Sequence, residues 1–243
     1  MTFNIQNSKP SVEFDFGINV QKGLVEDFSA VGQFGYNPDV GTSFETITSV
    51  GGIYVYPTTA TTAVVTSSNS ASDDTGTVLI SGLDQNFNIA SETVTIGGSA
   101  STTTFIRVFN ARMLTANTGD ANVGVITTTV DSKTVATIPV GYGSNLSCLY
   151  TVPANKRAWI VSASIGMSKQ KELESKIMVK GINNGNVWNT VGYQSSFSVP
   201  VYRKFEIPIL IEEKHDIEIR AKADATCAVS ASFSIFLEDT VQS

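Results

Sequence analysis

Cysteine and histidine are scarce in this chain of 243 residues, and each scarcity excludes a class of site. The two cysteines, Cys148 and Cys227, lie far apart and form no CxxC pair, which excludes zinc-finger and thioredoxin-type motifs. The sequence leaves a disulfide between them open, but favours two reduced thiols that fill small spaces in the core. The single histidine, His215, excludes a three-histidine metal centre.

Long apolar runs and clustered basic residues are also missing. No stretch approaches the roughly 18 apolar residues that a membrane span requires. The segment Met1–Gln6 lacks the basic start and apolar run of a signal peptide. The formal charge is −6, and no Lys or Arg occurs between Lys22 and Arg107. We therefore expect a protein made inside a cell, without a membrane or nucleic acid as partner.

Short β-branched and aromatic runs, separated by turn residues, make up most of the chain. Apolar residues form 42 % of the composition and charged residues only 16 %. The expected strands are Ile53–Tyr56, Ala63–Thr66, Thr77–Ile80, Glu92–Ile96, Thr104–Val108, Arg157–Ile165, Lys176–Gly181, Val187–Tyr193, Phe205–Ile207, Asp216–Lys222 and Cys227–Ile235. This spacing predicts an all-β fold of antiparallel β-sandwich or jelly-roll-like regions.

Few segments have the composition of a helix or of a long loop. The run from Ser168 to Lys176 favours helix but has a single apolar residue, so we interpret it as a charged hairpin tip. The Asn-Gly step at Asn184–Gly185 predicts a tight turn between the strands on either side of it. No helix is long enough for a βαβ crossover, which excludes Rossmann, P-loop and TIM-barrel folds.

Charge and threonine content divide the chain into three regions. Of 27 threonines, 19 lie between Gly51 and Tyr150, whereas basic and acidic residues are nearly balanced from Val152 onward. We predict an extended N-terminal arm (residues 1–44), a Thr-rich β-sandwich region (45–118) and a jelly-roll-like domain (119–243).

A search for catalytic chemistry returns only weak candidates. His215 lies in a charged stretch between two expected strands, which is typical of a turn residue, and no Gly-x-Ser-x-Gly motif is present. Two stretches, Asn69–Asp74 and Asn117–Asn122, carry oxygen ligands suited to calcium, but lack the closing glutamate of an EF-hand and read better as turns. We expect no enzyme activity, no cofactor and no metal.

Aromatic residues are concentrated in the predicted arm. Val12–Phe16 alternates as a short strand would, and several glycines make the arm extensible. The rings either fold back over the β regions or bury against another chain, and we favour the second, because aromatic residues commonly anchor interfaces. The candidate interface residues are Phe3, Phe14, Phe16, Phe28, Phe34, Tyr36 and Phe44.

Several short segments, taken in order, resemble virion proteins of tailed bacteriophages from aquatic hosts. They are SAVGQFGYN (29–37), VGTSFETI (40–47), GGIYVYP (51–57), GLDQNFN (82–88), ETVTIGG (92–98), FIRV (105–108), YTVPANK (150–156) and IEEKHDIEIRA (211–221). Similar proteins usually have Trp where Thr48 stands, Gly where Asn155 stands and Thr where His215 stands.

The resemblance implies a non-enzymatic structural component of the virion. We expect a capsid decoration protein, by analogy a homotrimer, that attaches to the major capsid protein or other virion proteins through its N-terminal arm. The alternative is a tail-fibre or spike component that binds host surface glycan. In that case Trp188 and Tyr193, beside the Asn-Gly turn, would stack on sugars.

Overall fold

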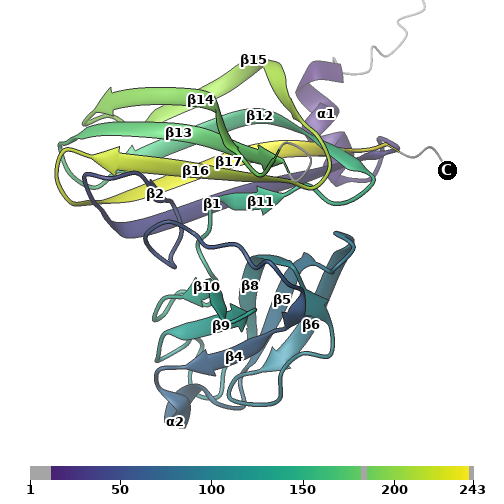
Figure 1. Cartoon of the computed structure of the whole chain (residues 1–243), viewed down its shortest axis with the longest axis vertical. Coiled ribbons are helices and arrows are strands. Elements are labelled where there is room, and N and C mark those ends of the chain that lie inside the picture. The colour runs from purple at the N-terminus through teal and green to yellow at the C-terminus, as the bar shows by residue number, and fades with distance from the viewer. Residues whose placement is uncertain (1–11, 182–184, 241–243) are drawn as a thin grey trace, which may run out of the picture.

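The computed structural model describes residues 12–181 and 185–240 and contains an upper and a lower body (Figure 1). The upper body consists of helix α1 (Val12–Gln21) and eight long or medium strands with the short strand β2 (Glu45–Thr46). Its eight main strands are β1 (Phe28–Val40), β11 (Leu149–Thr151), β12 (Lys156–Met167), β13 (Glu172–Gly181), β14 (Trp188–Phe197), β15 (Val201–Ile211), β16 (His215–Ala223) and β17 (Cys227–Asp239).

These eight strands form two antiparallel sheets with jelly-roll connectivity. One sheet has the order β1-β17-β12-β15 and the other β11-β16-β13-β14, with β2 added beside β16. Numbered in chain order, the eight strands run 1-8-3-6 and 2-7-4-5, which is the arrangement of a jelly roll. The structure thus confirms the all-β antiparallel class. We call this body the jelly roll.

The lower body is inserted between the first and second strands of the jelly roll, and we call it the insert. It contains helix α2 and three small antiparallel sheets, with the orders β3-β7, β6-β5-β8 and β10-β9-β4. Its elements are β3 (Thr61–Thr62), β4 (Val64–Ser67), α2 (Ser70–Asp73), β5 (Thr77–Leu83), β6 (Ile89–Thr95), β7 (Thr104–Phe105), β8 (Arg107–Thr115), β9 (Ile126–Val130) and β10 (Lys133–Ile138).

The regions drawn from composition and the bodies of the fold have different boundaries. Strand β9 pairs with β4, so residues 126–138 lie with the Thr-rich insert, beyond the predicted boundary at residue 118. Strand β1 pairs with β17 along almost its whole length, so residues 28–40 of the predicted arm supply a jelly-roll strand. Pairing between the two ends of the jelly roll leaves no local mark in the sequence, and composition therefore misses it.

Alternation of side chains explains the sandwich core. Every second residue of β17 from Cys227 to Leu237 is buried, and the residues between them lie on the outer face. Gly35 of β1 faces inward, where a Cβ atom would lie 2.2 Å from the carbonyl oxygen of Ile47 and 2.4 Å from the amide of Cys148. Only glycine fits this crossing, because the two backbones approach too closely for a side chain.

Three local predictions are wrong. Val12–Phe16 lies in helix α1, because alternation in so short a segment without a partner strand does not decide the backbone. Ile53–Tyr56 has no partner strand and forms an extended connection, although Tyr54 and Tyr56 still point into the core. The segment from Ser168 to Lys176 is no hairpin tip, because β12 and β13 belong to different sheets.

The hairpin predicted around the Asn-Gly step is confirmed by the pairing of β13 with β14. Gly185 and Asn186 have φ angles of +66° and +58°, as a turn of this kind requires. Residues 182–184 lie outside the described residues. Within the described ranges, no helix is long and apolar enough to cross a membrane.

Candidate functional surfaces

Some aromatic residues of the predicted arm pack against other residues of the chain, and others are exposed. Phe16 of α1 packs edge-on against Phe28 and Phe236, with ring centroids 5.7 and 4.9 Å apart. Phe44 lies beneath the ammonium groups of Lys176 and Lys222, at 4.1 and 5.1 Å.

The other aromatic candidates of the arm lie elsewhere. Phe34 is 58 % exposed and Tyr36 is half-buried, both on the outer face of β1. Phe3 lies outside the described residues, as does the side chain of Phe14.

Small side chains cover the middle of the outer face of the β1-β17-β12-β15 sheet. Ser162 and Ser164 of β12 lie opposite Ser234 and Ser232 of β17, and the hydroxyls of Ser164 and Ser232 are 2.7 Å apart. Phe34 of β1 pairs with Ser232 and Tyr202 of β15 pairs with Ser164, so these two rings flank the serines on the edge strands. Trp159 and Phe236 lie at one end of the face. This face is therefore flat at its centre and apolar at its margins.

A groove of about 1040 Å³ lies at one end of this outer face. Helix α1 forms one wall through Phe16, β15 forms another through Phe205 and Pro208, and Trp159 and Phe236 lie between them. The indole Nε1 of Trp159 donates to Glu238 at 2.7 Å, and Arg157 also binds Glu238. These polar groups satisfy one another, so the groove offers a mainly apolar surface.

A second surface with exposed apolar side chains follows the edge strands β14 and β15. Each is the last strand of its sheet, and the two are consecutive in the chain. Phe197 is 65 % exposed, Tyr202 71 % and Ile207 86 %. The residues of β14 that pair at core-facing positions are Gly192, Gln194 and Ser196. In β14 the core-facing positions are thus small or polar. In β15, Val201, Phe205 and Ile209 pack against the core, whereas the charged residues 203, 204 and 206 are exposed. We call this surface the β14–β15 edge.

The two residues proposed for glycan contact have different environments. The ring of Trp188 lies 4.6 Å from the Arg220 guanidinium, 5.0 Å from the Lys180 ammonium and 5.8 Å from the ring of Tyr56. Tyr193 is about half exposed, and its hydroxyl donates to Glu174 at 2.9 Å. Only Tyr193 thus presents an open aromatic ring.

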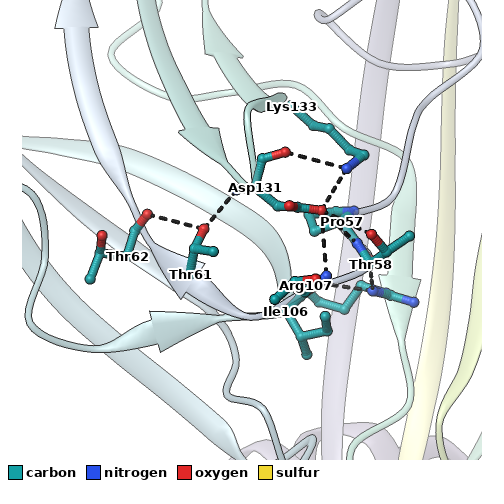
Figure 2. Close-up of polar contacts among 9 residues, drawn as sticks. Pro57, Thr58, Thr61, Thr62, Ile106, Arg107, Asp131 and Lys133 are labelled. Carbon is teal, nitrogen blue, oxygen red and sulfur yellow. Dashed lines mark hydrogen bonds and ion pairs between the residues drawn. The ribbon is translucent and has the colours of Figure 1, made fainter.

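A buried ionic cluster, which sequence reasoning missed, joins the insert to the jelly roll. Arg107 of β8 binds fully buried Asp216 of β16 through two hydrogen bonds of 2.8 and 3.0 Å. Asp216 also accepts from Thr151 at 2.7 Å and lies 3.3 Å from the Lys180 ammonium. The remaining Arg107 nitrogen donates to the carbonyls of Pro57 and Ile106 (Figure 2).

A second carboxylate, Glu218, completes this cluster. It is fully buried, pairs with Arg220 and accepts a hydrogen bond from Tyr56 at 3.2 Å. Burial raises the pKa of Glu218, although Arg220 acts in the opposite direction. Burial likewise raises the pKa of Tyr56 well above its usual value. The clear alternation at Asp216–Lys222 places both carboxylates on one face, but Arg107, which binds Asp216, is about a hundred residues away in sequence.

The other chemical candidates have structural surroundings. His215 follows a turn, its Nδ1 lies 2.9 Å from the carbonyl of Glu213, and its ring lies against Gly181. Cys148 and Cys227 are free and buried, as predicted, and burial raises the pKa of both thiols. No cluster of three or more His, Cys, Asp or Glu side chains suited to a metal ion occurs among the described residues.

The two stretches considered for calcium lie together and are bonded to each other. Asp73 accepts hydrogen bonds from the amides of Val123 and Gly124, at 2.8 and 2.7 Å, and from the Ser67 hydroxyl. Thr118 donates to the carbonyl of Ser72. Burial raises the pKa of Asp73, but these hydrogen bonds outweigh it and lower the pKa overall. The carboxylate thus serves to close two loops.

Comparison with known proteins gives little further information. No protein-family model and no curated protein matches the chain. Among solved structures, a chain from the structure of infectious bursal disease virus, Gx strain, is similar over 87 % of this chain and 71 % of the viral chain. The identity is 11 % and the TM-score 0.23, so the similarity supports no transfer of function.

Proposed function

We propose that this chain is a non-enzymatic structural protein of a bacteriophage virion that acts as a homo-oligomer on the particle surface. The β14–β15 edge supports this proposal. Phe197, Tyr202 and Ile207 are exposed along these two edge strands, and exposed apolar side chains favour association. The charged residues and Pro208 of β15 and the register shifts of both strands limit direct strand pairing, so the contact would be made by side chains.

The jelly roll and the resemblance in the sequence agree with this role. Jelly rolls occur in viral capsid proteins, but also in lectins and enzymes, so the fold alone does not select a function. A trimer would suit the local threefold positions of an icosahedral shell, and the N-terminal segment before β1 would then be available to contact the major capsid protein. Within this proposal, the role that we favour is decoration of the capsid surface.

The test is the mass of the full chain in solution. We expect sedimentation equilibrium to show an oligomer, and Tyr202→Lys or Phe197→Lys to weaken its association at least tenfold, because each places a charge on the β14–β15 edge. Ile89→Lys is the matched control, since Ile89 is 61 % exposed on the insert. A monomeric wild-type chain at high concentration would refute the proposal, as would an oligomer that both edge variants leave unchanged.

Attachment to the particle is tested separately. We expect the full chain to co-sediment with phage heads assembled without it, and a variant that lacks residues 1–24 to remain in the supernatant. Equal binding of the two forms would show that the N-terminal segment is not the attachment site.

The alternative role, glycan binding by a fibre or spike, rests on Tyr193 alone. Trp188 is engaged by Lys180, Arg220 and Tyr56, which leaves its ring little free surface for a sugar. Adsorption of the isolated protein to host cells, in competition with host polysaccharide, would favour this alternative over capsid decoration.

A further inference from the structure

Two further clefts adjoin on the outer face of the β1-β17-β12-β15 sheet, beyond the groove beside α1. Their volumes are about 460 and 350 Å³, which is the range of small-molecule sites. Three residues line both clefts, so we treat the two as one site and call it the tyrosine cleft. The residues that define it are Phe34, Tyr36, Tyr142, Ser164, Tyr202 and Ser230.

Four aromatic rings border the tyrosine cleft, and they come from three separate parts of the chain. Phe34 and Tyr36 belong to β1, Tyr142 to the connection between β10 and β11, and Tyr202 to β15. Tyr36 is half-buried, and each of the other three rings is more than half exposed. Rings that the core does not cover are thus gathered around one hollow.

A row of paired residues crosses the sheet between two of these rings. Phe34 pairs with Ser232, Ser232 with Ser164, and Ser164 with Tyr202. Adjacent strands lie about 4.8 Å apart, so the two rings stand about 14 Å from each other. The row presents a ring, two hydroxyls and a ring, which suits an extended ligand with alternating apolar and polar groups.

Hydroxyls supply the polar groups of the cleft, and charge is missing from it. Among the described residues, the hydroxyls of Tyr36, Tyr142 and Tyr202 have no hydrogen-bond partner, unlike those of the tyrosines that bind a carbonyl or a carboxylate. None of the described residues that line the cleft is charged. The groove beside α1, in contrast, is lined by Lys204 and Glu206. An ionic ligand would therefore gain no ion pair in the tyrosine cleft.

The floor of the cleft offers no free strand edge. Strand β17 pairs with β1 on one side and with β12 on the other, and β12 pairs also with β15. A peptide that binds as an added strand needs unpaired backbone groups at a sheet edge. The cleft has side-chain hydroxyls and ring faces instead, which favours a sugar over a peptide.

Gly166, near the end of β12, keeps the floor low. A Cβ atom at this position would lie 3.5 Å from the Ser230 hydroxyl oxygen and 3.8 Å from Cβ of Pro200, which are ordinary contacts. The fold would thus accept a side chain here. Glycine weakens a strand and often marks a place where a ligand approaches closely. Gly166 leaves space for such a ligand.

We propose that the tyrosine cleft binds a neutral oligosaccharide. The face of an aromatic ring is negative and the CH groups on a sugar face are slightly positive, so the two stack. The free tyrosine and serine hydroxyls both donate and accept hydrogen bonds, as sugar hydroxyls do. This site goes beyond the proposed function. It lies on a different sheet from Tyr193 and does not depend on where the chain stands on the particle.

Calorimetric titration of the full chain with hexasaccharides tests the proposal. The probes are neutral hexamers of glucose, galactose, mannose, xylose and N-acetylglucosamine, and a charged hexamer of galacturonic acid. We expect at least one neutral hexamer to bind with a millimolar or lower dissociation constant, and the charged hexamer to bind at least tenfold more weakly. Tyr36→Ala and Tyr142→Ala should each weaken the binding at least tenfold. Tyr193→Ala is the matched control and should leave it unchanged.

Gly166→Val gives a second measurement that removes no ring. We expect it to weaken binding at least tenfold with an unchanged circular dichroism spectrum, because the new side chain fills the floor of the cleft. No binding of any neutral hexamer, or binding that Tyr36→Ala and Tyr142→Ala leave unchanged, would overturn the proposal. So would weaker self-association of Tyr142→Ala with unchanged sugar binding, which would assign the cleft to a contact between copies. A monomeric wild type would refute the proposed function and leave the sugar site standing.

Discussion

Several carboxylates of the insert bind backbone amides and hydroxyl groups in place of basic side chains, and Asp131 combines such bonds with an ion pair to Lys133. Asp84 accepts from the amides of Asn86 and Asn88, at 2.8 and 2.9 Å. Asp131 accepts from the amide and hydroxyl of Thr58 (Figure 2). Each acid therefore closes a turn, a role that Asp commonly has in loops. Several acids of the stretch without Lys or Arg, residues 23–106, thus find partners other than basic side chains.

The pH dependence of the free energy of unfolding tests whether the Glu92 carboxylate holds its loop through hydrogen bonds of this kind. Burial would raise the pKa of Glu92, but hydrogen bonds from Thr102 and Thr103 outweigh it and lower the pKa from 4.5 to about 2. The folded pKa lies below the unfolded one, so the stabilisation is complete above pH 4.5 and is lost as the pH falls toward 2.

We expect Glu92→Gln to reduce the free energy of unfolding at pH 7 by about 1 kcal/mol, the low end for hydrogen bonds to a charged group, because Glu92 is partly exposed. The difference in the free energy of unfolding between Glu92→Gln and the wild type should shrink as the pH falls from 4.5 to 2. Urea denaturation at pH 7, 4 and 2.5 measures it, with Glu206→Gln as control. A difference that stays constant with pH would contradict the assignment.

At the scale of elements, the N-terminal region consists of parts with different roles. Strand β1 pairs with β17 and contributes buried Val40 to the core. Helix α1 covers one end of the outer face. We therefore expect removal of the helix and removal of the strand to have different effects.

Deletion of residues 1–24 should leave the far-UV spectrum of a β protein and a cooperative melt. Deletion of residues 1–44 should abolish the cooperative melt, because it exposes the core face of β17 and leaves β17 without a neighbour on that side. Circular dichroism during heating distinguishes the two. A deletion of 1–44 that melts like the shorter deletion would show that β1 is dispensable.

At the scale of the whole molecule, the Arg107–Asp216 pair connects two bodies that are otherwise built from separate sheets. Removing one member of a buried pair leaves the other charge without its partner, which destabilises by about 3–5 kcal/mol. Lys180 remains near Asp216, so we expect Arg107→Met to destabilise by about 3 kcal/mol.

Calorimetry of the full chain should show a lower Tm for Arg107→Met and a separation of the transitions of the insert and the jelly roll. Arg157→Met is the control, because its pair with Glu238 is partly exposed and worth less than about 1 kcal/mol. Equal loss of stability in the two variants would show that the buried pair does not couple the two bodies.

Prediction from sequence succeeded where one strand carries its own pattern. The alternation in β16 and β17, the hairpin of β13 and β14 and the buried thiols are all local features. It failed where a partner from far along the chain decides the structure. Phe16 packs against Phe28 and Phe236 because the fold places α1 against strands β1 and β17, and no pattern near Phe16 records this.

The amino-acid sequence by itself determined the backbone class, because the side-chain period of a strand and the choice of turn residues are local properties. Tertiary structure decided which apolar residues remain uncovered. The groove beside α1 and the β14–β15 edge each depend on register and on pairing between distant strands. The same phenylalanine or tyrosine belongs to a core or to an interface according to what the rest of the chain places over it.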